Sequence, residues 1–183
     1  FCFIYAIIME IVLSCNYKDI DQLQVLLVFI TSEVTRMPNY ESITLREDLH
    51  IRKIYSIHYF EYMKDYVFDG ESHDFWEFVF VDSGNLFVTA GDKEVLLASN
   101  EMIFHKPNEF HAVRSDGQIA PNLIVISFDL SVSNKSDLQL SSEKQLFALS
   151  DRILRIDQTE RRLLALIIQE AKQSFDCRLD DPY

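Results

Sequence analysis

The sequence contains little glycine, proline and cysteine, and it has fewer basic than acidic residues. Four glycines and four prolines in 183 residues exclude a low-complexity or disordered chain, because such chains are usually rich in them. The three cysteines, Cys2, Cys15 and Cys177, lack the even count and close spacing of a disulfide framework or a zinc site, so a reducing cytoplasm is the expected compartment. With 17 Lys and Arg against 29 Asp and Glu, the net charge of -12 argues against nucleic-acid binding by this surface.

The chain also lacks a hydrophobic run long enough to cross a membrane. Residues 1–13 are apolar but include Glu10, and a spanning helix needs about 20 apolar residues. No basic segment with an initiating Met precedes this run, so a secretory signal is not indicated. The hydrophobic content of 48% and the length are typical of one globular domain with an appendage.

Residues 1–36 differ from the rest, and we expect that they are untranslated upstream sequence. Residues 32–35 can be encoded by a purine-rich run of the kind that pairs with the ribosome, and Met37 follows shortly after. Translation would then begin at Met37, which the DNA upstream of that codon tests. The alternative is a genuine helical extension whose apolar face is formed by Ile20, Leu23, Leu27 and Ile30.

From residue 37 to residue 130 the pattern is that of a β domain. Short segments rich in Val, Ile, Phe and Tyr predict strands at 54–62, 76–81, 86–89, 94–97, 102–104 and 123–128. Gly91 and Asp92 separate two of them as a two-residue hairpin turn. Short strands joined by tight turns indicate an antiparallel sandwich or barrel, and they disfavour a doubly wound parallel sheet.

Residues 131–183 have the period of helices instead. Ser142 with Gln145, and Asp157 with Glu160, have the spacing of capping boxes and predict two helix starts. An apolar stripe on the second helix must be buried against the barrel or against another subunit. Its members are Leu164, Ile167, Ile168, Ala171 and Phe175. The arginines near this stripe are interpreted as a solvated helical face and not as a DNA contact. They are Arg152, Arg155, Arg161 and Arg162.

Two clusters of histidines and carboxylates lie among the predicted strands, at 73–77 and 104–111. Residues two apart in a strand share a face, so Glu71, His73 and Glu77 can point the same way, and His111 can join them from another strand. Two imidazoles and a carboxylate suit a divalent metal, as in non-haem iron proteins, but they are also ordinary hydrogen-bonding groups of a pocket. The aromatic rings of Trp76 and Phe78 face the opposite way and are predicted to pack in the core.

A family resemblance follows from these residues. Gly70, His73, Glu77 and Gly84, followed by Pro107 and His111, resemble the two short motifs of the cupin superfamily. Metal-binding cupins usually have a histidine where this chain has Glu71, and residues 108–109 lack the usual glycine of the second motif.

A closer resemblance is to the N-terminal sensing domain of AraC-type transcriptional regulators. It is carried by residues 102–111, by 120–123 leading into 125–128, and by a tail, similar to the helical linker of such regulators, at 160–164, 168–171 and 181–183. Altogether the resemblance covers about 43–183. It implies a cupin-like antiparallel β-barrel, a double-stranded β-helix or jelly roll, followed by C-terminal α-helices.

The resemblance also implies a function. Such a domain is cytoplasmic and homodimeric, binds a small effector such as a sugar or another polar metabolite, and controls a helix-turn-helix DNA-binding domain that is missing here. The expected ligand-binding residues are His73, Glu77, His111, Glu71 and His105. The apolar stripe from Leu164 to Phe175 would serve dimerisation. No catalytic residue, metal or cofactor is assigned.

Two alternatives come from other functional classes. The first is a metal-dependent cupin enzyme, an isomerase or dioxygenase, in which His73, Glu77 and His111 hold the metal. The second is a stand-alone cupin that binds a small molecule. Metal analysis of the purified protein tests the enzyme, and the reading frame after Tyr183 tests the stand-alone binding protein.

Overall fold

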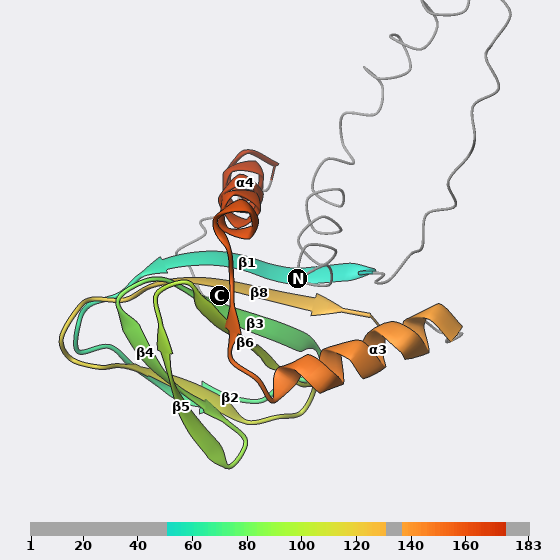
Figure 1. Ribbon diagram of the computed structural model, residues 1–183, viewed down its shortest axis with the longest axis horizontal. Helices are drawn as coiled ribbons and strands as arrows, with labels where there is room; N and C mark the ends of the chain where they lie inside the picture. The colour runs from blue at the N-terminus through green and yellow to red at the C-terminus, as the bar shows by residue number, and fades with distance from the viewer. Residues whose placement is uncertain (1–50, 131–136, 175–183) are drawn as a thin grey trace, which may run out of the picture.

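The computed structural model describes residues 51–130 and 137–174. In this part the chain forms two antiparallel sheets that face each other, with two helices beside them (Figure 1). The larger sheet consists, in spatial order, of β1 (Lys53–Glu61), β8 (Asn122–Asp129), β3 (Trp76–Ser83), β6 (Glu101–His105) and β9 (Leu154–Arg155). The smaller sheet consists of β2 (Val67–Glu71), β7 (His111–Ser115), β4 (Asn85–Ala90) and β5 (Lys93–Ala98). The helices are α3 (Asp137–Ser150) and α4 (Gln158–Ser174).

The larger sheet has two buried faces because successive side chains of a strand point to opposite sides. On β3, the rings of Trp76, Phe78 and Phe80 face the helices and form what we name the outer core. Val79 and Val81 face the smaller sheet and form part of what we name the inner core. The predicted mainly β barrel is therefore confirmed, and so is the placement of Trp76 and Phe78 away from the polar residues.

The predicted hairpin between β4 and β5 is also confirmed. Ala90 pairs with Lys93, so Gly91 and Asp92 form a two-residue turn. Gly91 has a φ of 57°, in the left-handed region that favours glycine.

One of the two predicted helix starts is right and the other is wrong. Asp157 Oδ1 accepts hydrogen bonds from the amides of Thr159 and Glu160, at 2.7 and 2.9 Å. Glu160 Oε2 in turn accepts from the Asp157 amide at 2.8 Å, which completes the capping box at the start of α4. The Ser142 spacing does not mark a start, because α3 begins at Asp137 and Ser142 lies inside it.

The apolar stripe on α4 packs within its own chain. Leu164, Ile167 and Ala171 are fully buried and Ile168 is 7% exposed, all within the outer core. Their prediction as a dimerisation surface is corrected for this reason: the larger sheet of the same chain covers these four side chains, while Phe175 lies outside the described residues. The four arginines are exposed, as expected of a solvated face. Two of them form ion pairs, Arg155 with Glu101 and Arg161 with Asp82.

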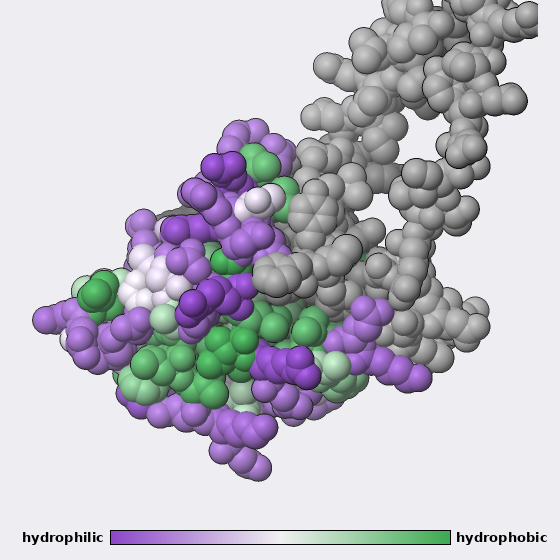
Figure 2. Space-filling view, in the orientation of Figure 1, coloured by the Kyte–Doolittle hydropathy of each residue, from purple (hydrophilic) through white to green (hydrophobic). Residues whose placement is uncertain are grey.

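The hydropathy of the surface agrees with the burial of the apolar stripe of α4 against the larger sheet. In Figure 2 the visible side of α4 is largely hydrophilic, and hydrophobic residues gather lower down, where Figure 1 draws the sheets. Neither helix of the described part has the length and hydropathy needed to cross a membrane. The predictions for residues 1–36, including a start at Met37, lie outside the described residues, and the domain boundaries at 37–130 and 131–183 stay predictions.

Candidate functional site

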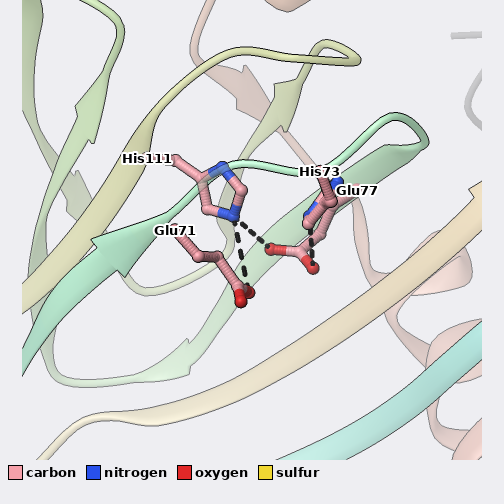
Figure 3. A group of neighbouring side chains, drawn as sticks. All are labelled: Glu71, His73, Glu77 and His111. Carbon is pink, nitrogen blue, oxygen red and sulfur yellow. Dashed lines mark ion pairs between the residues drawn. The ribbon is translucent and has the colours of Figure 1, made fainter.

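Four predicted residues converge at one end of the space between the sheets (Figure 3). Glu71 ends β2, His73 lies between β2 and β3, Glu77 is on β3, and His111 begins β7. Glu71 and His111 are register partners across the smaller sheet. Gly70 makes this pairing possible, since a side chain there would meet the His111 carbonyl oxygen at 2.7 Å. The site thus joins both sheets.

The charged atoms of this group lie close together. Nε2 of His111 is 3.5 Å from Oε1 of Glu77 and 3.8 Å from Oε1 of Glu71. Nε2 of His73 is 3.6 Å from the other oxygen of Glu77. The Glu77 side chain is 9% exposed and that of Glu71 is 48% exposed, so Glu77 lies deep in the site and Glu71 at its mouth.

Two serines form a hydrogen-bonded chain that ends at the Glu77 carboxylate, one on the adjacent strand β8 and the other on β1 beyond it. Ser127 Oγ donates to Glu77 Oε2 at 2.7 Å, and Ser56 Oγ donates to Ser127 Oγ at 2.8 Å. Both serines are register partners across the sheet, Ser127 of Glu77 and Ser56 of Ser127. Sequence reasoning missed them, although their positions on the inward face of β1 and β8 were a usable signal.

Hydrogen bonds to backbone carbonyls determine which nitrogen of the His73 and His111 rings carries a proton. Nδ1 of His73 lies 3.0 Å from the Phe75 oxygen, and Nδ1 of His111 lies 3.0 Å from the Glu109 oxygen. A carbonyl oxygen only accepts hydrogen bonds, so both Nδ1 atoms carry the proton. In the neutral rings, Nε2 therefore presents a lone pair toward the carboxylates. Both Nε2 atoms are buried without a hydrogen-bond partner.

The environment shifts the pKa values of these groups in different directions. Burial opposes ionisation of Glu77, but the nearby His73 ring and the Ser127 hydroxyl outweigh it and lower the pKa of Glu77. Burial likewise disfavours the charged form of His73, but the Glu77 carboxylate raises the pKa of His73 above 6.5. Burial, together with the neighbouring His105 ring, lowers the pKa of His111. The Glu77 carboxyl group is therefore ionised at neutral pH.

The group borders a cavity of about 570 Å³ between the sheets, within the roughly 300–1,000 Å³ of small-molecule sites. Aromatic rings form much of its wall. One stack runs from His73 through Phe75 to Tyr55, with ring centroids 3.8 and 4.1 Å apart. The other consists of His58, Phe60, Tyr62 and Tyr66. Further lining residues are Ser56, Phe68, Glu71, Glu77, Val79, His111, Val113, Leu123, Val125 and Ser127.

His105 is the predicted ligand-binding residue that does not line the cavity. Its ring is fully buried and stacks on His111 with centroids 4.4 Å apart. It points toward Glu109, with Nδ1 3.9 Å from Oε2. Although burial opposes it, the His105 ring and Lys106 lower the pKa of Glu109 to about 2. The expectation that His105 contacts a ligand is corrected on this ground, because His105 supports His111 from behind.

The same four residues meet the chemical requirements of a divalent metal site. One ligand atom from each of Glu71, His73, Glu77 and His111 lies within 4.8 Å of all the others. Two imidazole lone pairs and two carboxylates form a donor set that suits zinc, iron or manganese.

A hollow between two antiparallel sheets, with polar side chains at one end, defines the class of this protein as a ligand-binding β-barrel of the cupin type. Its family follows from the sequence. The family model described as the AraC-like ligand binding domain matches residues 53–180. The chain belongs to this family, which confirms the resemblance found in the sequence. No curated protein matches the chain significantly.

Several solved structures resemble parts of the chain. TT1209 from Thermus thermophilus is 20% identical with a TM-score of 0.36, over 39% of this chain and 69% of that one. The Cnp3 cupin domain of Schizosaccharomyces pombe is 11% identical with a TM-score of 0.39, over 48% and 65%. Hydroxypropylphosphonic acid epoxidase from S. wedmorenis, solved with fosfomycin, is 29% identical with a TM-score of 0.30, over 33% and 36%. For the Cnp3 domain and the epoxidase, the matched region spans less than two thirds of the solved chain.

Proposed function

We propose that this chain is the effector-sensing part of an AraC-type transcriptional regulator of the cytoplasm. A small molecule enters the cavity, contacts Glu77 and His111, and shifts the balance between two conformations by its different affinity for them. A helix-turn-helix domain elsewhere in the protein reads the operator. The observation that carries the proposal is the open, aromatic-walled cavity with a buried polar group in a member of this family.

Effector binding is tested by calorimetry after a thermal-shift screen of sugars, polyols, amines and organic acids. We expect at least one compound to bind, and we expect His111→Ala or Glu77→Ala to weaken it by about tenfold or more, since each removes a buried polar contact. Circular dichroism establishes that the variants fold. Unchanged binding in both variants would contradict the assignment of the site.

The regulatory part of the proposal has its own test in the DNA that follows the codon for Tyr183. An open frame that continues into a basic helix-turn-helix sequence supports a regulator. An in-frame stop at that point favours the stand-alone binding module.

We propose further that the domain pairs as a homodimer. Since the larger sheet covers the described part of the α4 stripe, the contact must use other residues. Light scattering on the purified chain is expected to give twice the mass of one chain, and a monomer across the micromolar range would contradict pairing by this part.

The second candidate is a metal-dependent enzyme, which the donor set of two imidazoles and two carboxylates favours. Glu71, His73, Glu77 and His111 would hold the ion, which would supply Lewis acidity or oxygen activation. The two carboxylates would balance a divalent charge. Stoichiometric metal in protein purified without chelator, lost in His73→Ala, supports this candidate. Metal-free protein that binds an effector supports the sensing domain, which acts without turnover.

A further inference from the structure

We propose that the ligand of this cavity is an organic cation, an ammonium or similar group carried on an apolar or aromatic body. The inference rests on the proposed function, because it names the chemical class that the sensing cavity admits.

The charges that line the cavity are of one fixed sign. Among the residues that the structure describes, the lining includes two carboxylates, Glu71 and Glu77, and no lysine or arginine. A second cavity of the molecule differs in this respect. It has a volume of about 460 Å³, lies between α4 and the larger sheet, and is lined by Arg161 and Lys172 beside Asp82. An anionic guest in the first cavity would meet two carboxylates without a permanent positive charge to offset them.

The two carboxylates lie beside the same ring nitrogen, Nε2 of His111, and together form the anionic end of the cavity. Glu77 is 9% exposed, and a charge pair in such a low-dielectric place attracts more strongly than in water. Its Oε2 is already bonded to Ser127, so the carboxylate is held in one orientation. Glu71 lies on the opposite sheet at the mouth. A cation entering from solvent would therefore pass one carboxylate and arrive at the other.

The walls complete a site for a cation with a hydrophobic body. The faces of aromatic rings attract positive charge, and rings gathered around a hollow are a recurrent means of binding ammonium groups. Here the pair of Tyr62 and Tyr66, stacked at 3.5 Å, and the pair of Tyr55 and Phe75, stacked at 4.1 Å, both line the cavity. Apolar side chains such as Val79 complete the lining. The net charge of -12 adds a long-range attraction for cations.

The test uses three probes of similar size that differ in charge: benzylammonium, benzyl alcohol and benzoate. Each is titrated into the full 183-residue chain after treatment with EDTA, and affinities are measured by calorimetry. We expect benzylammonium to bind about tenfold more tightly than benzyl alcohol, and benzoate to bind most weakly. Benzyltrimethylammonium, which has no N–H donor, is expected to keep the advantage, since the attraction is to charge.

Two matched variants test whether the Glu77 carboxylate causes the preference for the cation. Glu77→Gln keeps the shape of the side chain and removes its charge, so the advantage of the cation should fall about tenfold. Glu94→Gln makes the same exchange on an exposed residue outside the cavity, paired with Arg114, and should change nothing. If Glu77→Gln fails to fold, Glu71→Gln at the mouth is the substitute, with a smaller loss expected.

The possible outcomes distinguish a wrong ligand class from a wrong proposed function. A preference for the cation that disappears in Glu77→Gln and persists in Glu94→Gln supports the proposal. Equal binding of cation and alcohol, or stronger binding of benzoate, overturns the ligand class and leaves the cavity as a sensing site. Failure of every probe to bind overturns the ligand class and also counts against the proposed function.

Discussion

The two faces of the larger sheet are covered in different ways. Its outer face is covered by α3 and α4, which leave a cavity of about 460 Å³ beside α4, and Phe78, Phe104 and Phe128 there are fully buried. Its inner face is packed against the smaller sheet at one end and borders the cavity at the other. The comparison teaches that dense packing and an open interior can coexist in one sheet, because alternate residues of each strand serve the two purposes.

The strongest test of this difference removes one aromatic ring from the outer core and one from the cavity wall. Phe78→Ala should lower the free energy of unfolding by about 3–5 kcal/mol, because it leaves a cavity among fully buried residues. Phe75→Ala removes a half-buried ring from the cavity wall and should cost about 1 kcal/mol. Urea unfolding followed by circular dichroism measures both. Equal losses would show that the two faces stabilise the fold alike.

A smaller loss of stability is expected when the N-terminal cap of α4 is removed. This helix lies over the outer face of the larger sheet. Asp157→Ala removes the cap of two amides and should cost about 1 kcal/mol. Asp151→Ala, at an exposed ion pair with Lys106, is the matched control and should cost less than about 0.5 kcal/mol. A loss at Asp157 no larger than at Asp151 would mean that the cap does not hold this helix.

The cavity face should respond to pH. The folded pKa of His73 is raised, so its contribution to stability is complete below 6.5 and is lost as pH rises through that higher pKa. The folded pKa of His111 is lowered, so stability falls as pH drops below 6.5. Together they predict a maximum of this contribution near pH 6.5.

Urea unfolding of the wild type and of His73→Asn at several pH values measures this contribution. The variant should lose the decline on the alkaline side and keep the decline on the acid side. Phe75→Leu, which retains both histidines, serves as the control and should keep both declines. An unchanged alkaline decline in His73→Asn would show that another group causes it.

The sequence predicted the strands that are rich in apolar residues, and it missed those in which polar residues interrupt the apolar pattern. β3 and β8 have runs of Val, Ile and Phe that indicate strands, and both were found. β2 contains Asp69 and Gly70, and β7 contains His111 and Arg114, so neither resembles a strand locally. Pairing with a neighbour overrides weak propensity in such strands.

The site was predicted in part for a similar reason. Spacing along one strand predicted that Glu71, His73 and Glu77 share a face, which is wrong in its reason: Glu71 ends β2, His73 follows it and Glu77 is on β3 in the other sheet. The fold nevertheless brings the three together, and His111 joins them. Spacing could not show that His105, six residues before His111, lies behind it, since the chain between them turns back and pairs with the other sheet. Nor could it show that the rings of β1 enclose a hollow, because that depends on how far apart the two sheets stand.

Glu77 and Glu71 are attached to supports of unequal stiffness. β3 lies in the middle of the larger sheet and has residues in both cores, so any displacement of it would disturb packing on two sides. β2 is the edge of the smaller sheet, is bonded to β7 alone in that sheet, and alternates between exposed and half-buried residues. Guests of different length would be accommodated by outward movement of β2, while the deep carboxylate keeps its place as a fixed reference point. Tolerance of size would then reside on β2, and the deeper of the two carboxylates that select charge would reside on β3.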